Sequence, residues 1–316
     1  MNVPASIALL GSALVACHGG RRVSTRPAPG VHSRVETFVI DAPELGQRQR
    51  TIRVYLPGGY APGGVVYPVL YLQDGQQIFT AGPFGDWLVD ETMDKLVAAG
   101  EIGGVIVVAV DHSEHRWDEY GPWVNQRMHD WIAPSWTRPS QGGEGSAYVR
   151  FVVHTLKPEI DRRYRTMPGR EHTGIGGSSM GGLIALYAGL TRPDVFSKVM
   201  AMSTAVWFAE QGGPWLSANR LLAELRGRAL PRNVRFYLDV GTNERSRDRD
   251  PDVLDARGEP VAYPRAYLEG SRAVAGALAA GGVPVSNLKH VIDHGAPHHE
   301  SAWARRFAGA VLWLYQ

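Results

Sequence analysis

The sequence predicts an α/β fold with a mostly parallel, twisted sheet and helices on both of its faces. Strand-like and helical segments alternate along most of the 316 residues, which is typical of a parallel sheet joined by right-handed crossovers. Several of the strand-like segments are short, unbroken apolar runs, as expected for strands covered on both faces. The chain has no evident linker in its middle and no evident repeat of about 20 to 50 residues, which argues against solenoids and propellers.

The expected elements follow in order. Residues 34–40 and 51–56 alternate apolar and polar side chains, which predicts an opening antiparallel pair. Residues 87–98 have helical spacing, with Asp86 as their N-cap. The other expected strands are 69–72, 105–110, 172–176, 198–203, 235–240 and 285–292, and the other expected helices are 146–164, 183–190, 219–226, 264–280 and 300–314. Ligands bind at the carboxyl ends of parallel strands, so an active site is expected at that edge.

One long segment, residues 111–143, has no sustained period. A loop of this length in a compact domain is usually functional or disordered, and its tryptophan content argues against disorder. We therefore expect an ordered insertion over the active edge, whose aromatic rings either contact substrate or pack as a satellite hydrophobic cluster. Its tryptophans are Trp117, Trp123, Trp131 and Trp136. The candidates for substrate contact are Trp117, Trp123 and, from a later segment, Trp207.

The overall charge argues against a nucleic-acid partner. Lys and Arg total 33 against 31 for Asp and Glu, which gives a formal charge of +2, and the chain has no long basic run. A phosphate-binding face would need such a concentration of positive charge. A hydrophobic content of 44% with 37 Gly and 21 Pro fits a globular protein with many turns.

The first residues predict export. Ile7 to Ala16 form an apolar run that is too short for a stable membrane anchor but has the length of a signal-peptide core. The sequence Leu-Val-Ala before Cys17 resembles a bacterial lipoprotein signal, although the first six residues lack Lys and Arg. We expect a signal peptide over residues 1–16, a flexible tether over 17–33 and the folded domain over 34–316. Lipid on Cys17 would attach the exported protein to a membrane of the bacterial cell envelope. A misassigned start or a buried N-terminal segment is the alternative.

A G-x-S-x-G frame runs from Gly177 to Gly181 and is centred on Ser179. It lies between the expected strand 172–176 and the expected helix 183–190, which is the context of a nucleophile elbow. A serine hydroxyl is a poor nucleophile unless the turn presents Oγ to a histidine base and places backbone N–H groups where an oxyanion forms. A glycine-rich turn with an incidental serine is the alternative.

A serine nucleophile on such a sheet needs an acid and a base later in the chain, in the order Ser, Asp or Glu, His. Glu244 follows the expected strand 235–240 and is the preferred acid. Asp239 lies within that strand and would replace Glu244 only if the strand ended early. Asp248 and Asp250 belong to a highly charged loop and are expected to be solvated.

The base and the oxyanion hole have several candidates. His294, His298 and His299 all precede the last helix, and position alone does not choose among them. The oxyanion hole should combine the backbone N–H of Met180, next to the nucleophile, with one from the loop after an early strand. In that loop Gln76 is the preferred donor, Gln77 is the alternative, and a simple surface turn would make neither of them functional.

Several segments together resemble a known family, the putative esterases of the α/β-hydrolase superfamily. This family includes esterase D-like enzymes, ferric enterobactin esterases, feruloyl and acetyl xylan esterase modules, and the related mycolyltransferases. The similarity runs from about Arg34 to the C-terminus. The segments that carry it are residues 67–76, Arg116 to Tyr120, Gly176 to Leu183, Gly241 to Glu244, and His298 to Trp303.

The resemblance implies an α/β-hydrolase fold and a choice of residues. In the family the catalytic histidine commonly stands five residues before a tryptophan, which selects His298, before Trp303. The Gly-Thr-Asn-acid turn supports Glu244, where many members have Asp. The oxyanion loop reads Asp-Gly-Gln, ending at Gln76, where many relatives have His-Gly-Gly.

Two groups of His and Asp residues suggest a metal site as an alternative to a serine hydrolase. His290, His294, His298 and His299 cluster with Asp293, and Asp111, His112 and His115 form a second group. Zinc ligands usually come from rigid spacings on a helix or knuckle, whereas Gly295 and Pro297 break any helix through the first group. We therefore expect no metal and no cofactor.

The expected function is that of a serine esterase that hydrolyses carboxylic esters through an acyl-enzyme. Its substrate would be a small-molecule or polymer-linked ester, such as a siderophore or plant-polymer ester with an aromatic acyl group. One alternative is an acyltransferase that delivers the acyl group to a sugar or lipid hydroxyl. The other is a non-catalytic cell-surface binding protein, because a fold alone does not determine function.

Overall fold

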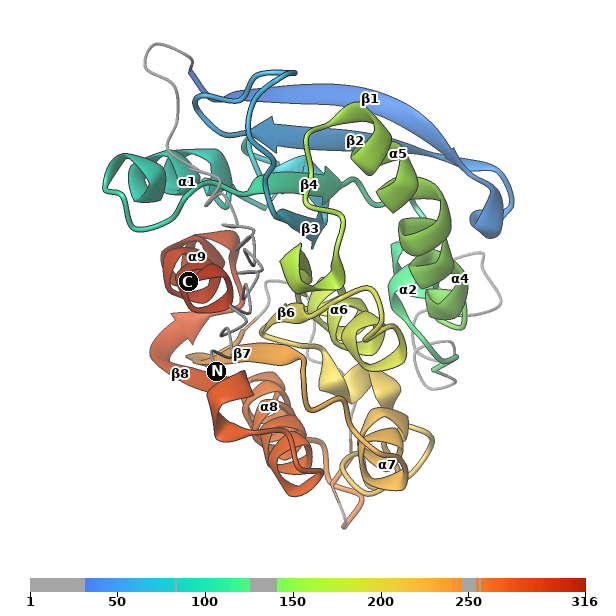
Figure 1. Cartoon of the computed structure of the whole chain (residues 1–316). Coiled ribbons are helices and arrows are strands. Elements are labelled where there is room, and N and C mark those ends of the chain that lie inside the picture. Colours follow the sequence, from blue (N-terminus) through green and yellow to red (C-terminus); the bar gives the residue numbers. More distant parts are fainter. Residues whose placement is uncertain (1–31, 83, 126–140, 246–253, 256) are drawn as a thin grey trace, which may run out of the picture.

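The computed structural model describes residues 32–82, 84–125, 141–245, 254–255 and 257–316. Its centre is an eight-stranded sheet of order β1-β2-β4-β3-β5-β6-β7-β8 (Figure 1). β2 runs antiparallel to both of its neighbours, and the remaining pairings are parallel. The strands are β1 (Arg34–Ala42), β2 (Arg48–Leu56), β3 (Val69–Gln73), β4 (Ile106–Val110), β5 (Thr173–Ser178), β6 (Lys198–Met202), β7 (Arg235–Asn243) and β8 (Leu288–Pro297).

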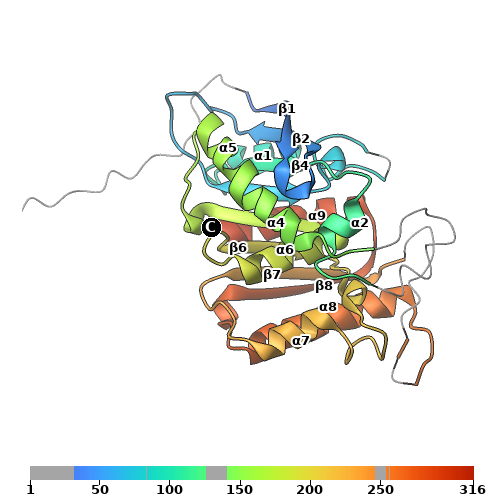
Figure 2. The same ribbon diagram turned by 90° about the vertical axis from the view of Figure 1, so that its right-hand side faces the viewer.

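Helices cover both faces of this sheet. Those described are α1 (Val89–Ala98), α2 (Arg116–Tyr120), α4 (Gly145–Arg150), α5 (Lys157–Arg163), α6 (Met180–Thr191), α7 (Arg220–Gly227), α8 (Tyr263–Ala280) and α9 (Glu300–Tyr315). Buried side chains of α1 and α9 pack on one face, and those of α4 to α8 pack on the other, which lies toward the viewer in Figure 2. The predicted fold class is confirmed.

The burial of the strands follows from their place in the sheet. Every residue of β3, β4 and β5 is buried, because helices cover both faces there. The edge strand β1 instead alternates partly buried and exposed side chains. Continuous apolar runs therefore correctly indicated the sheet's centre, and alternation correctly indicated its edge.

Some boundaries differ from the expectation. β7 runs on to Asn243 and β8 to Pro297, because their parallel pairing continues past a register shift at Gly241. The expected helix 146–164 is one continuous helical segment, in which a π-helical stretch, Phe151–Leu156, joins α4 to α5. Helix α1 starts at Val89, since Leu88 takes a left-handed conformation (φ 53°) and its N–H donates to the Asp86 carboxylate at 2.8 Å.

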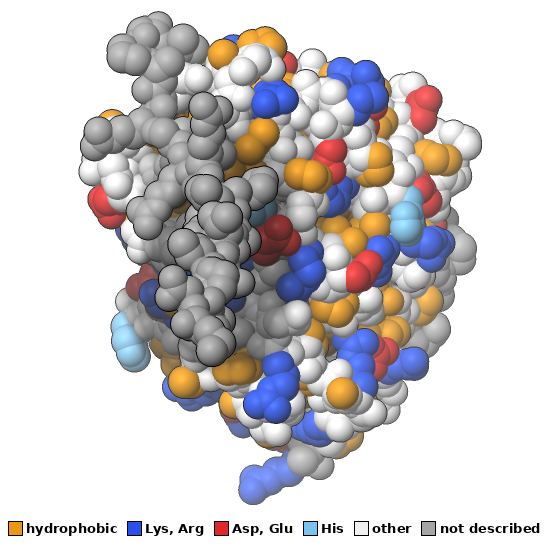
Figure 3. Space-filling view, viewed as in Figure 1, with side chains coloured by type: hydrophobic (Ala, Val, Ile, Leu, Met, Phe, Trp, Pro, Cys, Tyr) orange, Lys and Arg blue, Asp and Glu red, His pale blue; other side chains and the backbone are white. Residues whose placement is uncertain are grey.

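The segment 111–143 contains a short helix, α2, that the sequence pattern did not indicate. Trp131 and Trp136 lie outside the described residues, so the expectation of an ordered insertion stays a prediction. Cys17, the signal peptide and most of the tether lie outside them as well. Within the described residues, no helix has the length and apolar character needed to cross a membrane. On the face drawn in Figure 3, basic and acidic side chains are interspersed.

Candidate active site

Ser179 stands at the sharp turn between β5 and α6. Its backbone is at φ 56° and ψ −122°, a conformation that L-residues rarely adopt. The turn is pinned from both sides, because the Ser179 N–H donates to the Met202 carbonyl and the Ser179 carbonyl accepts from the Ala205 N–H, both at 3.0 Å. A Cβ on Gly177 would come within 2.8 Å of the Gly181 backbone, so the two glycines let the arms of the turn approach. Ser179 itself remains partly exposed.

Glu244 and His298 meet at the same edge of the sheet as this turn, each directly after the end of its strand. His298 Nδ1 lies 2.7 Å from Glu244 Oε2. A carboxylate can only accept, so Nδ1 carries the proton and Nε2 is left as the acceptor. The Glu244 side chain is fully buried, and its Oε1 accepts from the Ser203 hydroxyl at 2.6 Å and from the Gly241 N–H.

Aromatic rings enclose the His298 imidazole. Its ring centroid is 4.6 Å from that of Tyr267, 5.8 Å from that of Tyr263 and 5.0 Å from that of Trp303. The Trp303 indole N–H also donates to Ser203 Oγ at 2.9 Å. Since Ser203 donates in turn to Glu244, Trp303 contacts both His298 and the residue that binds Glu244. The five-residue spacing from His298 to Trp303 is explained by this contact, because the first turn of α9 places the indole against the imidazole.

The rival acid Asp239 has a different partner. Its Oδ1 lies 3.1 Å from the Arg306 guanidinium, and burial raises the pKa of the Asp239 carboxyl to about 6 while Arg306 opposes the rise. Arg306 also donates to Ser203 Oγ at 3.0 Å and contacts Asp293 at 3.2 Å. Asp239 and Glu244 are therefore neighbours, and only Glu244 is hydrogen-bonded to His298. The other acidic candidates, Asp248 and Asp250, lie outside the described residues.

The remaining histidines of this region have separate partners. His299 is the N-cap of α9, where its Nδ1 accepts from the Ser301 N–H at 3.2 Å. His290 Nε2 lies 3.0 Å from the Ser271 hydroxyl, and His294 is exposed. In the described part of the chain, no group of three or more His, Cys, Asp or Glu side chains is placed to hold a metal ion.

On the other side of Ser179, the loop after β3 contains Gln76 within a 3-10 turn, Gly75–Gln77. The Gln76 side chain is tied to the backbone of His112, donating to its carbonyl at 2.8 Å and accepting from its N–H at 3.1 Å. Asp74, in a left-handed conformation at the start of the turn, binds Arg116 through both carboxylate oxygens at 2.6 and 2.8 Å. The Asp74 N–H donates to the Tyr120 hydroxyl at 3.2 Å. Side chains from the two ends of α2 thus fix the path of this loop.

Helix α2 also carries a buried carboxylate, Glu119, which lies fully out of solvent. Arg50 contacts Glu119 closely, and Arg48 donates to it at 2.9 Å, both from β2. The segment from Arg116 to Tyr120 therefore anchors the loop after β3 on one side and β2 on the other. The family resemblance rests partly on this segment, but the sequence alone indicates no role for it.

The tryptophan candidates separate into two groups. Trp117 is partly exposed, and its ring is 6.3 Å from that of Trp207, which in turn is 6.3 Å from Tyr263 beside His298. Trp123 instead packs edge-on against Tyr187 of α6, and its indole N–H donates to Glu224 of α7 at 3.2 Å. Trp117 and Trp207 thus belong to an aromatic wall that reaches His298, whereas Trp123 belongs to the helix layer.

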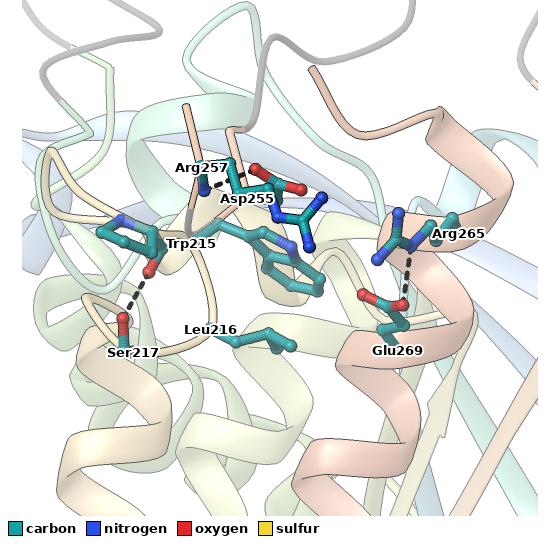
Figure 4. Close-up of a pocket in the computed structure, with 8 residues that line it drawn as sticks. Trp215, Leu216, Ser217, Asp255, Arg257, Arg265 and Glu269 are labelled. Atoms are coloured by element: carbon teal, nitrogen blue, oxygen red, sulfur yellow. Dashed lines mark hydrogen bonds and ion pairs between the residues drawn. The ribbon is translucent and has the colours of Figure 1, made fainter. Parts of the chain in front are cut away.

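A pocket of about 560 Å³ opens on the far side of α8 (Figure 4). Arg265 and Glu269 of α8 line it, and they are paired with each other at 2.7 Å. Tyr263 and Tyr267 point the opposite way, because residues two positions apart on a helix face nearly opposite directions. The lining residues are Pro214, Trp215, Leu216, Ser217, Asp255, Arg257, Arg265 and Glu269. This pocket shares a helix with the Ser179 region but none of its side chains.

Three residues at the Ser179 cluster escaped the sequence analysis: Ser203, Tyr267 and Arg306. A signal was present for two of them. Tyr267 lies in the expected helix 264–280 and Tyr263 directly precedes it, and their spacing of four residues places them on one face when the helix starts at Tyr263. Arg306 is a charge at a position that helical spacing aligns with apolar residues, since Ala302 and Ala310 lie about one turn to either side of it. Ser203 carries no such signal, because its importance comes from a position at the end of β6 that only the fold reveals.

Comparisons with known proteins agree with this architecture. The family model described as "putative esterase" matches residues 43–314. The uncharacterized protein YbbA of Bacillus subtilis is 24% identical over 86% of this chain and 94% of its own length. The ferri-bacillibactin esterase BesA of the same organism is 30% identical over 44% of this chain and 48% of its own.

Solved structures share the fold over nearly the whole described domain. A ferulic acid esterase superposes with a TM-score of 0.63 at 20% identity, covering 90% of this chain and 98% of that one. The enterobactin esterase FES from Shigella flexneri superposes with a TM-score of 0.65 at 17% identity, covering 92% of this chain and 60% of that one.

Proposed function

Because the chain belongs to the putative esterase family and is a carboxylic ester hydrolase, we propose that it works through an acyl-enzyme on Ser179. The observation that carries the proposal is the 2.7 Å contact between His298 and Glu244, at the same sheet edge as the strained turn of Ser179. The position of Tyr267 also supports the proposal, because this side chain contacts both Ser179 and His298. Its hydroxyl is 3.3 Å from Ser179 Oγ, and its ring lies against His298.

The first half-reaction forms the acyl-enzyme. Ser179 Oγ attacks the ester carbonyl carbon while His298 Nε2 takes the hydroxyl proton. Glu244 keeps Nδ1 protonated and stabilises the imidazolium that forms, and its own charge is available because its other contacts are to neutral donors. His298 then gives the proton to the leaving alcohol.

The oxyanion of each tetrahedral intermediate would be bound by the backbone N–H groups of Met180 and Gln76. One such donor is typically worth about 3 kcal/mol of transition-state stabilisation. The support for this part is positional, because Met180 opens α6 and Gln76 follows β3, the strand next to β5. Water then attacks the acyl-enzyme with His298 again as the base, and the acid is released. The mechanism requires no cofactor and no metal.

We further propose an ester with an aromatic acyl group as substrate, of the siderophore or plant-polymer class. The wall formed by Trp117, Trp207 and Tyr263 supports this, since aromatic rings pack well against an aromatic acid. The printed names of a ferri-bacillibactin esterase, which is similar in sequence, and of a ferulic acid esterase, which shares the fold, agree with a substrate of this class. Trp123 is left out because its contacts are with α6 and α7.

The test combines covalent labelling with a substrate panel. A fluorophosphonate probe should label Ser179, and Ser179→Ala should lose the label and at least about a thousandfold in kcat while keeping its Tm. A panel of p-nitrophenyl, feruloyl and catecholate esters identifies the acyl group. Folded wild-type protein that takes no label and cleaves no ester of the panel would contradict the proposal.

Export and lipid attachment at Cys17 form a separate part of the proposal, supported by the apolar run before that residue. In a bacterial host, labelled palmitate should enter the wild-type protein and not the Cys17→Ser variant. Incorporation into both, or into neither, would contradict it.

A further inference from the structure

The Tyr267 hydroxyl lies at the centre of the proposed active site without a role in the mechanism above. Tyr267 is fully buried on α8, and its oxygen is 3.3 Å from Ser179 Oγ and 3.1 Å from the Tyr263 hydroxyl. Its ring centroid is 4.6 Å from that of His298. One side chain thus touches both the nucleophilic atom and the base.

The sheet order decides which part of a substrate this hydroxyl faces. Of the two proposed oxyanion donors, Met180 directly follows Ser179 and Gln76 comes from the β3 side of β5. His298 instead follows β8, and Tyr267 lies on the helix between β7 and β8. Tyr267 is therefore on the His298 side of Ser179. That is also the side of the alcohol oxygen, because His298 has to reach this oxygen to protonate it. In the tetrahedral intermediate the same carbon carries Oγ and the alcohol oxygen, so a donor that is beside Oγ and on the His298 side is within reach of the alcohol oxygen.

Tyr267 is equipped to donate and not to act as a base. Burial raises the pKa of its hydroxyl to about 12, although hydrogen bonding to Ser179 and Tyr263 opposes the rise, so the proton is present at any working pH. Ser179 Oγ has two lone pairs and one proton, and it can accept from Tyr267 while donating to His298. Tyr263 can donate to the Tyr267 oxygen, which would strengthen the Tyr267 donor.

Resting on the proposed function, we propose that Tyr267 is a further catalytic residue, whose hydroxyl donates a hydrogen bond to the leaving alcohol oxygen. As the C–O bond to the alcohol breaks, its electron pair goes to the alcohol oxygen, which takes the proton from His298. Tyr267 stabilises the charge that develops before this transfer is complete, and it keeps its own proton. The contribution is largest for a strongly basic alkoxide and small for a leaving group that carries its own charge well.

The leaving-group dependence of Tyr267→Phe tests this role. The measurement is kcat/KM for ethyl ferulate and p-nitrophenyl ferulate, two esters that share an acyl group, because kcat/KM contains only the steps through acylation. The variant should lose about tenfold or more with the ethyl ester, as for a lost hydrogen bond to a charged group, and no more than about twofold with the p-nitrophenyl ester. The matched control is Tyr164→Phe, which removes a hydroxyl that is bonded to Glu36 at the β1 edge of the sheet, away from the proposed site. It should leave the ratio of the two constants within about twofold of the wild-type ratio.

Equal losses with both esters would overturn the inference, since they would make Tyr267 a residue that only holds the site together. Wild-type values of kcat/KM with both esters would overturn it too. Should Tyr267→Phe fail to fold, as judged by circular dichroism, 3-fluorotyrosine at position 267 keeps the ring and makes a stronger donor. It should raise the ethyl-to-nitrophenyl ratio, and a ratio that does not rise counts against the inference. Ser179→Ala separates this result from the proposed function: full activity in that variant defeats both, whereas an inactive Ser179→Ala beside an unchanged Tyr267→Phe ratio defeats only this one.

Discussion

The two flanks of Ser179 each contain a buried carboxylate, and the two are neutralised in different ways. On the β3 flank, Asp74 is 4% exposed and is bound by both of its oxygens to Arg116. On the β7 and β8 flank, Glu244 is fully buried and is bound to the Ser203 hydroxyl, the Gly241 N–H and the His298 imidazole. One carboxylate has a permanent cation as its partner, and the other has a group that gains a proton only during the proposed reaction.

The difference separates a structural carboxylate from one that is available for catalysis. A buried carboxylate with a permanent cation is already stabilised, and it has little to gain when a neighbour becomes charged. Arg306 could have neutralised Glu244 in this way, but it pairs with Asp239, and the Ser203 hydroxyl lies between the guanidinium and Glu244. The charge of Glu244 is thereby left for the imidazolium.

The largest effect is expected on the β7 and β8 flank, from removal of the proposed base. His298→Ala should lower kcat by at least about a thousandfold, because both proton transfers are lost. The neighbouring His299→Ala serves as the control. It should keep near-normal kcat and lose about 1 kcal/mol of folding free energy, since His299 caps α9. Steady-state kinetics and urea unfolding of both variants decide the matter, and the reverse pattern would assign the base to His299.

The next effect compares the two acids of the same flank. Glu244→Gln keeps the shape and removes the charge, so kcat should fall by about a hundredfold or more. Asp239→Asn should instead change kcat much less, because Asp239 contacts Arg306 and not His298, and near neutral pH it should lower the folding free energy by no more than about 1 kcal/mol, since burial already disfavours the charge that it removes and Asp293 still contacts Arg306. Kinetics and urea midpoints separate these outcomes. Near-normal turnover in Glu244→Gln would point to a Ser–His dyad or to Asp239.

Asp239 also predicts a dependence of stability on pH. Its folded pKa, about 6, is raised above the ordinary value of 3.8, so between these values the folded state binds more protons than the unfolded state. Stability should therefore fall as the pH rises from about 4 to about 6 and should then level off, by at most about 3 kcal/mol. The measurement is the difference between wild type and Asp239→Asn in free energy of unfolding across this range. A difference that does not change with pH would contradict a raised pKa.

How far the sequence predicted the molecule differs between its parts. The sheet and its two helix layers follow from local patterns, because continuous apolar runs, alternation and helical spacing are readable without tertiary contacts. The placing of Ser179, Glu244 and His298 at one edge follows from their positions after strands. Neither the ends of β7 and β8 nor the short helix α2 could be predicted, because strand pairing and the ion pairs of Arg116 decide them.

The side chains that organise the site were harder to predict than those proposed to react. Ser203 connects Glu244, Trp303 and Arg306, three residues that are distant in sequence. No local pattern encodes such a meeting, because it depends on where β6 ends relative to α9. The separation of Trp117 from Trp123 has the same origin, since the two rings stand six residues apart in one segment and pack against different parts of the fold.

The smallest effect is expected on the β3 flank, where the ion pair between Arg116 and Asp74 should only position the loop. Arg116→Lys keeps the charge but cannot bind both oxygens of Asp74 in the planar fork geometry that arginine provides. The loop that presents the Gln76 N–H should become looser, and kcat should fall by about tenfold with little change in KM, because an oxyanion donor acts in the transition state. Arg162→Lys, at an exposed pair with Glu159, is the control and should match wild type. If instead KM rises while kcat holds, Arg116 binds substrate directly, and the contrast between the two carboxylates no longer describes this flank.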